Sequence, residues 1–75
     1  MSTIKVSVAA SGVGWTVEAD GVFQPVAFFS GGRAEAYARG VSIASARAGY
    51  HTYLTVKDAG GHVVGKRFYP AEAVA

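Results

Sequence analysis

Two histidines, His51 and His62, are the side chains of this sequence that titrate closest to neutral pH, as a general base requires. They flank opposite ends of one expected hairpin, and neither has a second metal ligand close to it in the sequence. Two imidazoles alone do not make a zinc site. We interpret both as ordinary surface histidines and expect no metal site, no catalytic residues and no enzymatic activity.

A glycine-rich run, Ser30-Gly31-Gly32-Arg33, lies at the expected start of a helix. Backbone amides and the helix dipole can hold an anion at such a position. The run lacks the spacing and the lysine of a nucleotide-binding phosphate loop. A capping turn is therefore favoured over an anion site, and we expect no cofactor.

A third set of residues has the chemistry to bind a polyanion. Strand alternation turns polar side chains away from the expected helix, and these include tyrosine and lysine, which stack bases and hold phosphates in several modules. A plain solvated sheet or a dimer interface has the same composition. The candidate nucleic-acid contacts are Lys5, Tyr53, Lys57, Lys66 and Arg67.

Alternation of apolar and polar residues predicts strands over 3–9, 14–19 and 51–57. Strand-forming residues predict a strand over 22–29, and a glycine-containing hairpin loop precedes a final expected strand over 62–69. Asp20-Gly21 favours a type I′ hairpin turn between the second and third strands. Pro25 cannot donate to a ladder, so the third strand is expected to be short, bent or at an edge.

One long helix is predicted between Ser30, as its cap, and Gly49, as its left-handed end. Its best apolar stripe is Tyr37, Val41, Ala44 and Ala48. Gly40 suggests a close approach to the sheet. Ile43 lies off the stripe, which leaves two interpretations, a wider buried face or a side chain exposed for a partner.

These elements predict an α+β domain with the order ββ(β)αββ. We expect an antiparallel sheet of about four strands with the helix packed on one face. The expected core comprises Ile4, Val6, Val8, Trp15, Val17, Phe28, Tyr37, Val41, Leu54, Val56 and Phe68.

Length and composition limit the class of protein. A chain of 75 residues makes one domain, expected over 1–70, with a disordered tail over 71–75. Hydrophobic residues make up 51% and charged residues 16%, which indicates a packed core and leaves apolar surface for a partner. Without cysteines, a membrane-spanning run or a signal peptide, a cytoplasmic protein with no membrane partner is expected.

Several packing and turn motifs together resemble one known family. They are Gly14-Trp15-Thr16-Val17, Phe29 before the helix, Ala34-Glu35-Ala36 at its start, and Leu54-Thr55-Val56-Lys57-Asp58 followed by Gly60 or Gly61. The family is the small bacterial domain of unknown function 2188, and the resemblance covers the chain from about Val6 to Tyr69. It implies the fold given above. It implies no known activity and supplies no catalytic residues.

The sequence favours a non-enzymatic interaction module that associates with itself as a homodimer. The high apolar content of so short a chain motivates this hypothesis, and a sheet face, a strand edge or the Ile43 side of the helix would form the contact. The alternative is a weak nucleic-acid-binding protein that uses the open sheet face. A small enzyme is the least favoured hypothesis, because the sequence shows no recognisable catalytic nucleophile together with a general base.

Overall fold

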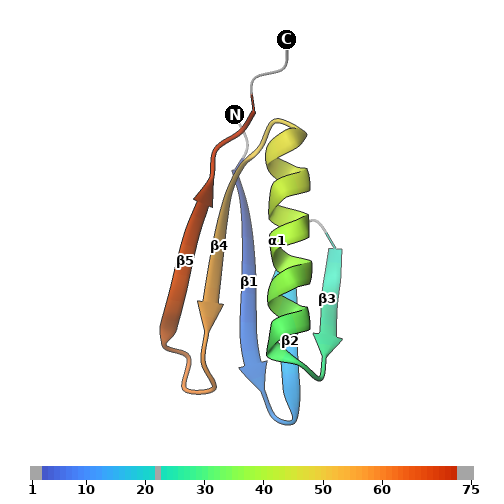
Figure 1. The fold of residues 1–75 in the computed structure, drawn as a ribbon, viewed down its shortest axis with the longest axis vertical. Coiled ribbons are helices and arrows are strands. Elements are labelled where there is room, and N and C mark those ends of the chain that lie inside the picture. Colours follow the sequence, from blue (N-terminus) through green and yellow to red (C-terminus); the bar gives the residue numbers. More distant parts are fainter. Residues whose placement is uncertain (1–2, 22, 73–75) are drawn as a thin grey trace.

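The computed structural model describes residues 3–21 and 23–72 of the chain. The elements run in the order β1 (Thr3–Ser11), β2 (Gly14–Ala19), β3 (Phe23–Phe28), α1 (Gly31–Arg47), β4 (His51–Lys57) and β5 (Val63–Tyr69). The strands form one sheet, and α1 lies across one face of it (Figure 1). The predicted α+β class, with one long helix on one side of a sheet, is confirmed.

The sheet differs from the prediction in size and in topology. It has five strands in the order β3-β2-β1-β4-β5, and its neighbours β1 and β4 run parallel. The other neighbouring strands are antiparallel. The helix explains the parallel pair, because it carries the chain back along the sheet, so that β4 begins at the same end as β1. The expectation of about four antiparallel strands is therefore wrong, and the sheet is mixed.

The edge strand β3 follows the prediction made from Pro25. Among the described strands it pairs with β2 alone, and its register shifts between Val17 and Ala19 of β2. The turn before it differs from the prediction. Gly21 has a φ of 74°, but Asp20 lacks the positive φ that a type I′ turn requires at both central residues. Ala19 pairs with Phe23, so the connection is longer than the two-residue turn that the sequence predicts.

The helix begins and ends where the sequence predicts. Ser30 has an extended backbone, and its Oγ accepts a hydrogen bond from the Arg33 amide at 3.3 Å. This bond satisfies one of the free amides of the first turn. At the other end Gly49 has a φ of 98°, the left-handed conformation that terminates helices. The capping interpretation of the glycine-rich run therefore agrees with the structure.

The face that the helix buries is not the predicted stripe. The buried helical residues are Ala34, Ala38, Ser42 and Ala46, a row with a spacing of four. Small side chains in this row let the helix lie close to the sheet, with Val6, Val8, Val17 and Leu54 beneath it. Tyr37 is 40% exposed, and Ala44 and Ala48 are exposed. The stripe prediction was wrong because it ranked helix faces by side-chain hydrophobicity, whereas the sheet selects for small volume.

The core is correspondingly smaller than expected. Of the predicted core residues, Val6, Val8, Val17 and Leu54 are buried, and Ile4, Trp15, Phe28, Val41 and Val56 pack against them while partly buried. Tyr37 and Phe68 are exposed instead. Ala19, Ser42 and Thr52 are buried although the sequence did not single them out. The Ser42 hydroxyl donates to the Ala38 carbonyl oxygen at 2.8 Å, so this buried hydroxyl group has a hydrogen-bond partner.

Two further helical residues settle questions that the sequence left open. Apart from the neighbouring backbone of α1 itself, no atom lies within 4 Å of the place where a Cβ atom of residue 40 would be. Gly40 therefore does not mark a close approach to the sheet. Ile43 is 40% exposed, so the interpretation of a wider buried face is wrong. Its role in a partner contact remains a prediction.

The chain after β5 is partly tied to the domain. The Ala71 amide donates to His51 Nδ1 at 3.0 Å, and the Glu72 amide donates to the Ala46 carbonyl oxygen at 2.9 Å. The expectation of a disordered tail over 71–75 is therefore wrong for Ala71 and Glu72. Residues 73–75 lie outside the described part of the chain. Within that part, α1 is too short and too polar to cross a membrane.

Candidate functional site

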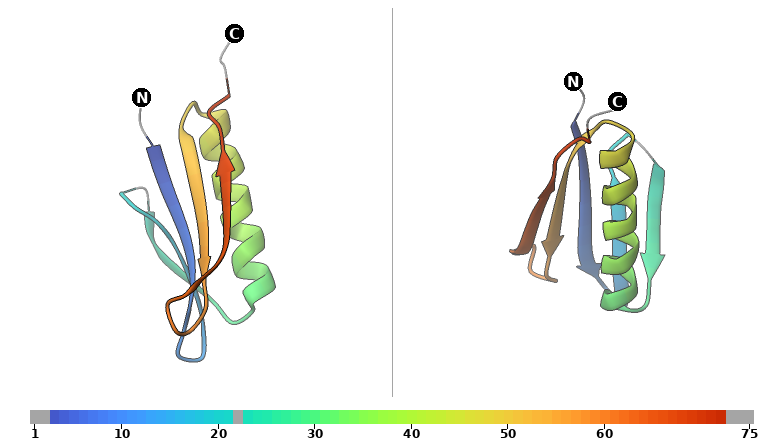
Figure 2. Two further views of the ribbon diagram at one scale, coloured as in Figure 1. Left: turned by 90° about the vertical axis from the view of Figure 1, so that its left-hand side faces the viewer. Right: turned by 45° about the horizontal axis from the view of Figure 1, so that its top comes forward.

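The sheet face turned away from α1 holds most of the predicted contacts. Alternate residues of a strand face opposite sides of a sheet, and Val6 and Leu54 face the helix. Their neighbours Lys5 and Tyr53, which lie opposite each other in the β1–β4 register, therefore face the other way. Lys57 lies further along β4, and Lys66 lies opposite Thr55 on β5. We call this surface the open face; Figure 2 (left) shows that no helix covers it.

Arg67 does not belong to the open face, although the sequence grouped it with Lys66. It lies opposite Leu54, whose side chain points into the core beneath the helix. Its guanidinium carbon lies 5.0 Å from the centre of the Tyr69 ring, a cation–π contact on the helix side. Consecutive strand residues necessarily point to opposite faces, so Lys66 and Arg67 cannot act as one basic pair.

Phe68 is the functional candidate that the sequence missed. It lies opposite Tyr53, and the centres of the two rings are 4.8 Å apart with an angle of 32° between their planes. Tyr53 is 48% exposed and Phe68 is 46% exposed. A phenylalanine in a strand was assigned to the core, yet its register with Tyr53 identifies the face to which it belongs. Two half-exposed rings in contact provide an aromatic surface.

His51 extends this aromatic surface at the beginning of β4. Its ring centre is 5.6 Å from that of Phe68. The bond that its Nδ1 accepts from the Ala71 amide leaves the proton of a neutral ring on Nε2. Because this bond holds the imidazole against Phe68, we assign His51 to the aromatic cluster and not to acid–base chemistry. The aromatic cluster is His51, Tyr53 and Phe68.

Lysines lie on both sides of the aromatic cluster. A shallow hollow of about 380 Å³ is bounded by Lys5, Tyr53 and Lys57, among others. A second hollow of about 270 Å³ lies on the β5 side of Tyr53 and is bounded by Phe68 and Lys66. Tyr53 thus stands between two depressions, each with a cationic side chain at its border.

The open face carries more positive than negative charges. Lys5, Lys57 and Lys66 contribute ammonium groups; Glu18, opposite Ser7 on β2, contributes a carboxylate away from the cluster, and Asp20, whose amide bonds to the Lys5 carbonyl oxygen, follows the end of β2 beside Lys5. No ion pair is recorded for these lysines within the described residues. The face can therefore offer ring surfaces for stacking beside cations for phosphate, the combination used by proteins that bind single strands.

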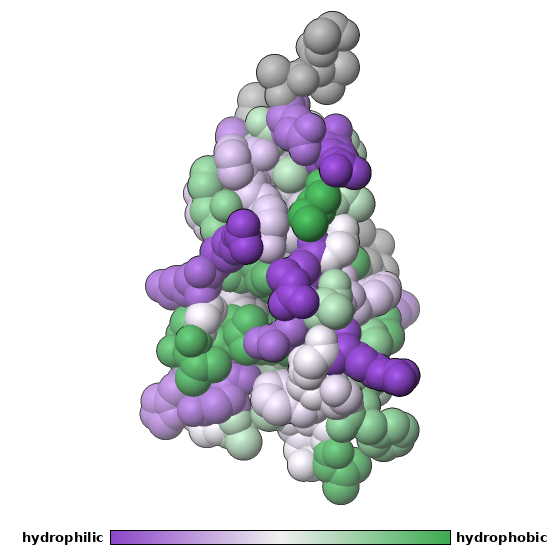
Figure 3. Space-filling model, in the orientation of Figure 1, coloured by the Kyte–Doolittle hydropathy of each residue, from purple (hydrophilic) through white to green (hydrophobic). Residues whose placement is uncertain are grey.

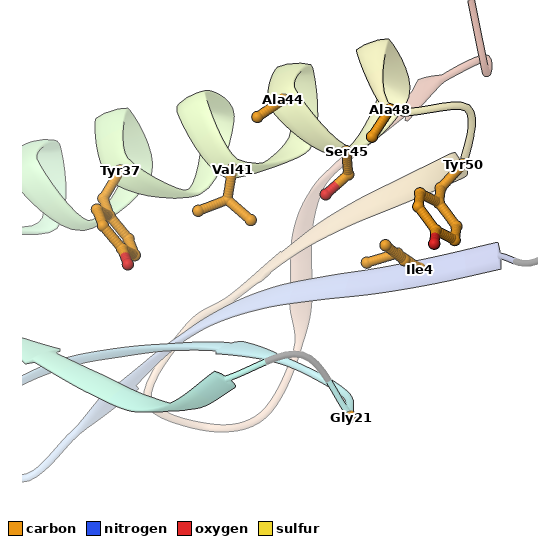
Figure 4. Close-up of a pocket in the computed structure, with 8 residues that line it drawn as sticks. All are labelled: Ile4, Gly21, Tyr37, Val41, Ala44, Ser45, Ala48 and Tyr50. Atoms are coloured by element: carbon orange, nitrogen blue, oxygen red, sulfur yellow. The ribbon is translucent and has the colours of Figure 1, made fainter.

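A second concave region lies on the helix side. It has a volume of about 660 Å³ and is lined by Ile4, Gly21, Tyr37, Val41, Ala44, Ser45, Ala48 and Tyr50. Figure 4 shows Tyr37 and Val41 reaching from α1 toward the sheet, with Tyr50 and Ile4 at the far end. The stripe that the sequence predicted as buried forms one wall of this cleft. The lining residues carry no charge, and none is a predicted contact.

The other residues considered in the sequence are not brought into a site. His51 and His62 lie at opposite ends of the β4–β5 hairpin. The His62 Nδ1 atom is 3.4 Å from Asp58 Oδ1, in an exposed loop where the same oxygen accepts the His62 and Gly60 amides at 2.9 Å. Within residues 3–21 and 23–72, no three acidic or histidine side chains gather as metal ligands would.

Comparison with models of protein families, with curated proteins and with solved structures found no match. The resemblance to the domain of unknown function 2188 therefore stays a prediction. What can be inferred about function comes from the open face itself.

Proposed function

We propose that this protein is a small interaction module that binds single-stranded nucleic acid through its open face. The observation that carries the proposal is the half-exposed contact between Tyr53 and Phe68, with lysines on both sides of it. Stacking on an aromatic side chain contributes about 1–3 kcal/mol per base, and lysines that neutralise phosphates add affinity. The residues assigned to binding are Lys5, Tyr53, Lys57, Lys66 and Phe68.

A single strand fits this surface better than a duplex. The cluster lies on a sheet, where the rings can contact only bases that are free of their own stack. The helix α1, which could enter a major groove, lies on the opposite side and contributes none of the assigned residues (Figure 1). We therefore expect duplex DNA to bind more weakly than a single strand of the same length.

The aromatic contribution is tested by substitutions at Tyr53. We expect Tyr53→Leu to weaken binding of a fluorescently labelled oligothymidylate by about tenfold, because a leucine fills space but offers no ring for stacking. Tyr53→Phe is the matched control and should bind within about twofold of the unaltered protein. Fluorescence anisotropy at low salt measures both. Equal affinities for the leucine and phenylalanine variants would refute the assignment of Tyr53.

The lysine contribution has its own signature in the salt dependence. For single strands, the logarithm of affinity falls with the logarithm of salt concentration by about 0.7 for each neutralised phosphate. Lys57→Gln should therefore lower the slope by about 0.7, whereas Arg39→Gln, on the exposed side of α1, should leave it unchanged. A slope that responds equally to both substitutions would indicate attraction by net charge alone.

Self-association is the second proposal, and one observation favours it. The edge strand β5 carries Val63 and Val64, which are 46% and 64% exposed. In Figure 3, a patch of hydrophobic residues lies at the left of the view, over the lower part of β5, with hydrophilic residues above and below it. Exposed apolar side chains on an unpaired edge are typical of strands that add to another chain.

A further inference from the structure

The two edges of the sheet differ in their capacity to accept another strand. β3 contains Pro25, which discourages pairing, whereas each of the two edge strands has one register shift against its neighbour. β5 has no proline between Val63 and Tyr69, and its pairing with β4 is regular from Gly65 onward. Its outer side has no neighbour within the described chain. The β5 edge is therefore the one available for a further strand.

The backbone groups that β5 directs outward follow from the sheet register. The Asp20 amide donates to the Lys5 carbonyl oxygen at 3.2 Å, so odd-numbered residues of β1 bond to β2 and even-numbered ones bond to β4. In the parallel β1–β4 pair, odd-numbered residues of β4 then bond to β1, and even-numbered ones bond to β5. Lys66 and Phe68 lie opposite odd-numbered residues of β4, so their N–H and C=O groups point to the free edge.

We propose that β5 pairs antiparallel with β5 of a second copy about a two-fold axis at Lys66, and that a bound single strand stabilises this dimer. The inference rests on the proposed function for the role of the nucleic acid, but not for the strand pairing. The register places Val64 of each copy opposite Phe68 of the other, which gives two exposed apolar side chains a cross-strand neighbour. Arg67 lies opposite Gly65 of the second copy, so no charge opposes it directly.

The same axis places Lys66 opposite Lys66 of the second copy, on the open face. Like charges directly opposite each other destabilise a strand pair. A polyanion that crosses the two open faces removes this repulsion, because its phosphates lie between the two ammonium groups. Pairing at this edge also joins the two open faces into one, so that a longer strand can contact both aromatic clusters. The charge at the axis thus couples dimerisation to binding.

Two substitutions of Lys66 separate the steps of this proposal. Lys66→Thr removes the repulsion and keeps the outward N–H. Lys66→Pro removes the repulsion and the N–H together, at an edge position where the fold does not use that group. Analytical ultracentrifugation of the free proteins should show Lys66→Thr dimerising about fivefold more tightly than the unaltered chain, as expected for loss of one like-charged pair. Lys66→Pro should remain monomeric, with a circular dichroism spectrum that reports an intact fold.

Salt and oligonucleotide length give the remaining tests. Dimerisation of the free, unaltered protein should strengthen as salt screens the lysine pair, whereas oligonucleotide binding should weaken. An oligothymidylate of about 20 nucleotides should shift the protein to a dimer, and one of about six should bind without doing so. If Lys66→Thr and Lys66→Pro have the same oligomeric state, or if Lys66→Pro does not fold, the strand pairing is refuted. If the dimer forms but neither oligonucleotide binds, the proposed function and the coupling fail while the pairing stands.

Discussion

At the scale of single residues, the hydroxyl group of Tyr69 is unusual because it is buried without a hydrogen-bond partner in the described part of the chain. The ring of Tyr69 receives the Arg67 guanidinium. A buried hydroxyl without a partner costs about 1–3 kcal/mol of desolvation that no bond returns. The ring and the hydroxyl of Tyr69 therefore have opposite effects on stability.

We expect Tyr69→Phe to leave the free energy of unfolding unchanged or to raise it by up to about 1 kcal/mol, because it removes the hydroxyl and keeps the ring. Urea denaturation followed by circular dichroism measures the change. Tyr50→Phe is the control, since that side chain is 39% exposed and its hydroxyl can reach solvent. A loss of more than about 1 kcal/mol in Tyr69→Phe would show that the hydroxyl has a partner.

Single residues also show where reasoning from the sequence reaches its limit. Alternation alone assigned Lys5, Tyr53 and Lys57 to the open face, because their strands are regular. Arg67 and Phe68 were misplaced because no alternation was read in β5, which contains an irregularity near its beginning, where Lys57 lies opposite Val63 but Val56 lies opposite Gly65. One inserted residue reverses the faces on either side of it. The register with β4, which the sequence does not contain, was needed to assign them.

At the scale of elements, one glycine lowers the stability of α1. Gly40 is exposed in the middle of the helix, with no neighbouring atom where a Cβ would lie. Glycine at such a position costs about 1 kcal/mol relative to alanine.

We expect Gly40→Ala to raise the free energy of unfolding by about 0.5–1 kcal/mol, measured as a higher urea midpoint with an unchanged slope. Gly14→Ala is the contrasting substitution, since its Cβ would lie 2.5 Å from the Phe28 carbonyl oxygen. It should destabilise the protein. If Gly40→Ala and Gly14→Ala changed the free energy of unfolding equally, the different surroundings described for these two glycines would be contradicted.

The elements themselves were largely predictable, and their assembly was not. The cap at Ser30 and the stop at Gly49 are encoded by local chemistry, and so are the alternating segments 3–9, 14–19 and 51–57. The parallel contact between β1 and β4 depends on how two antiparallel units are joined by a helix, and no local pattern records it. The helix face was mistaken for a similar reason, since only the packed sheet shows that Ala34 and Ala38 fit where Tyr37 does not.

At the scale of the whole molecule, the two sides of the sheet have different chemistry. One side is closed by α1 over a core of small and branched side chains. The other carries an aromatic cluster between lysines and has no helix across it (Figure 2). The formal net charge of +2 is small, so affinity for a polyanion must come from the arrangement of charges on one face and not from their total.

The central claim is that the open face, and not the helix side, binds a single strand. Backbone amide NMR of the full chain, titrated with oligothymidylate at low salt, tests this claim most directly. We predict that the largest shifts occur in β1, β4 and β5 around Lys5, Tyr53 and Phe68, and that α1 is unaffected. Shifts confined to the cleft beside Tyr37 and Tyr50, or no shifts at all, would contradict it.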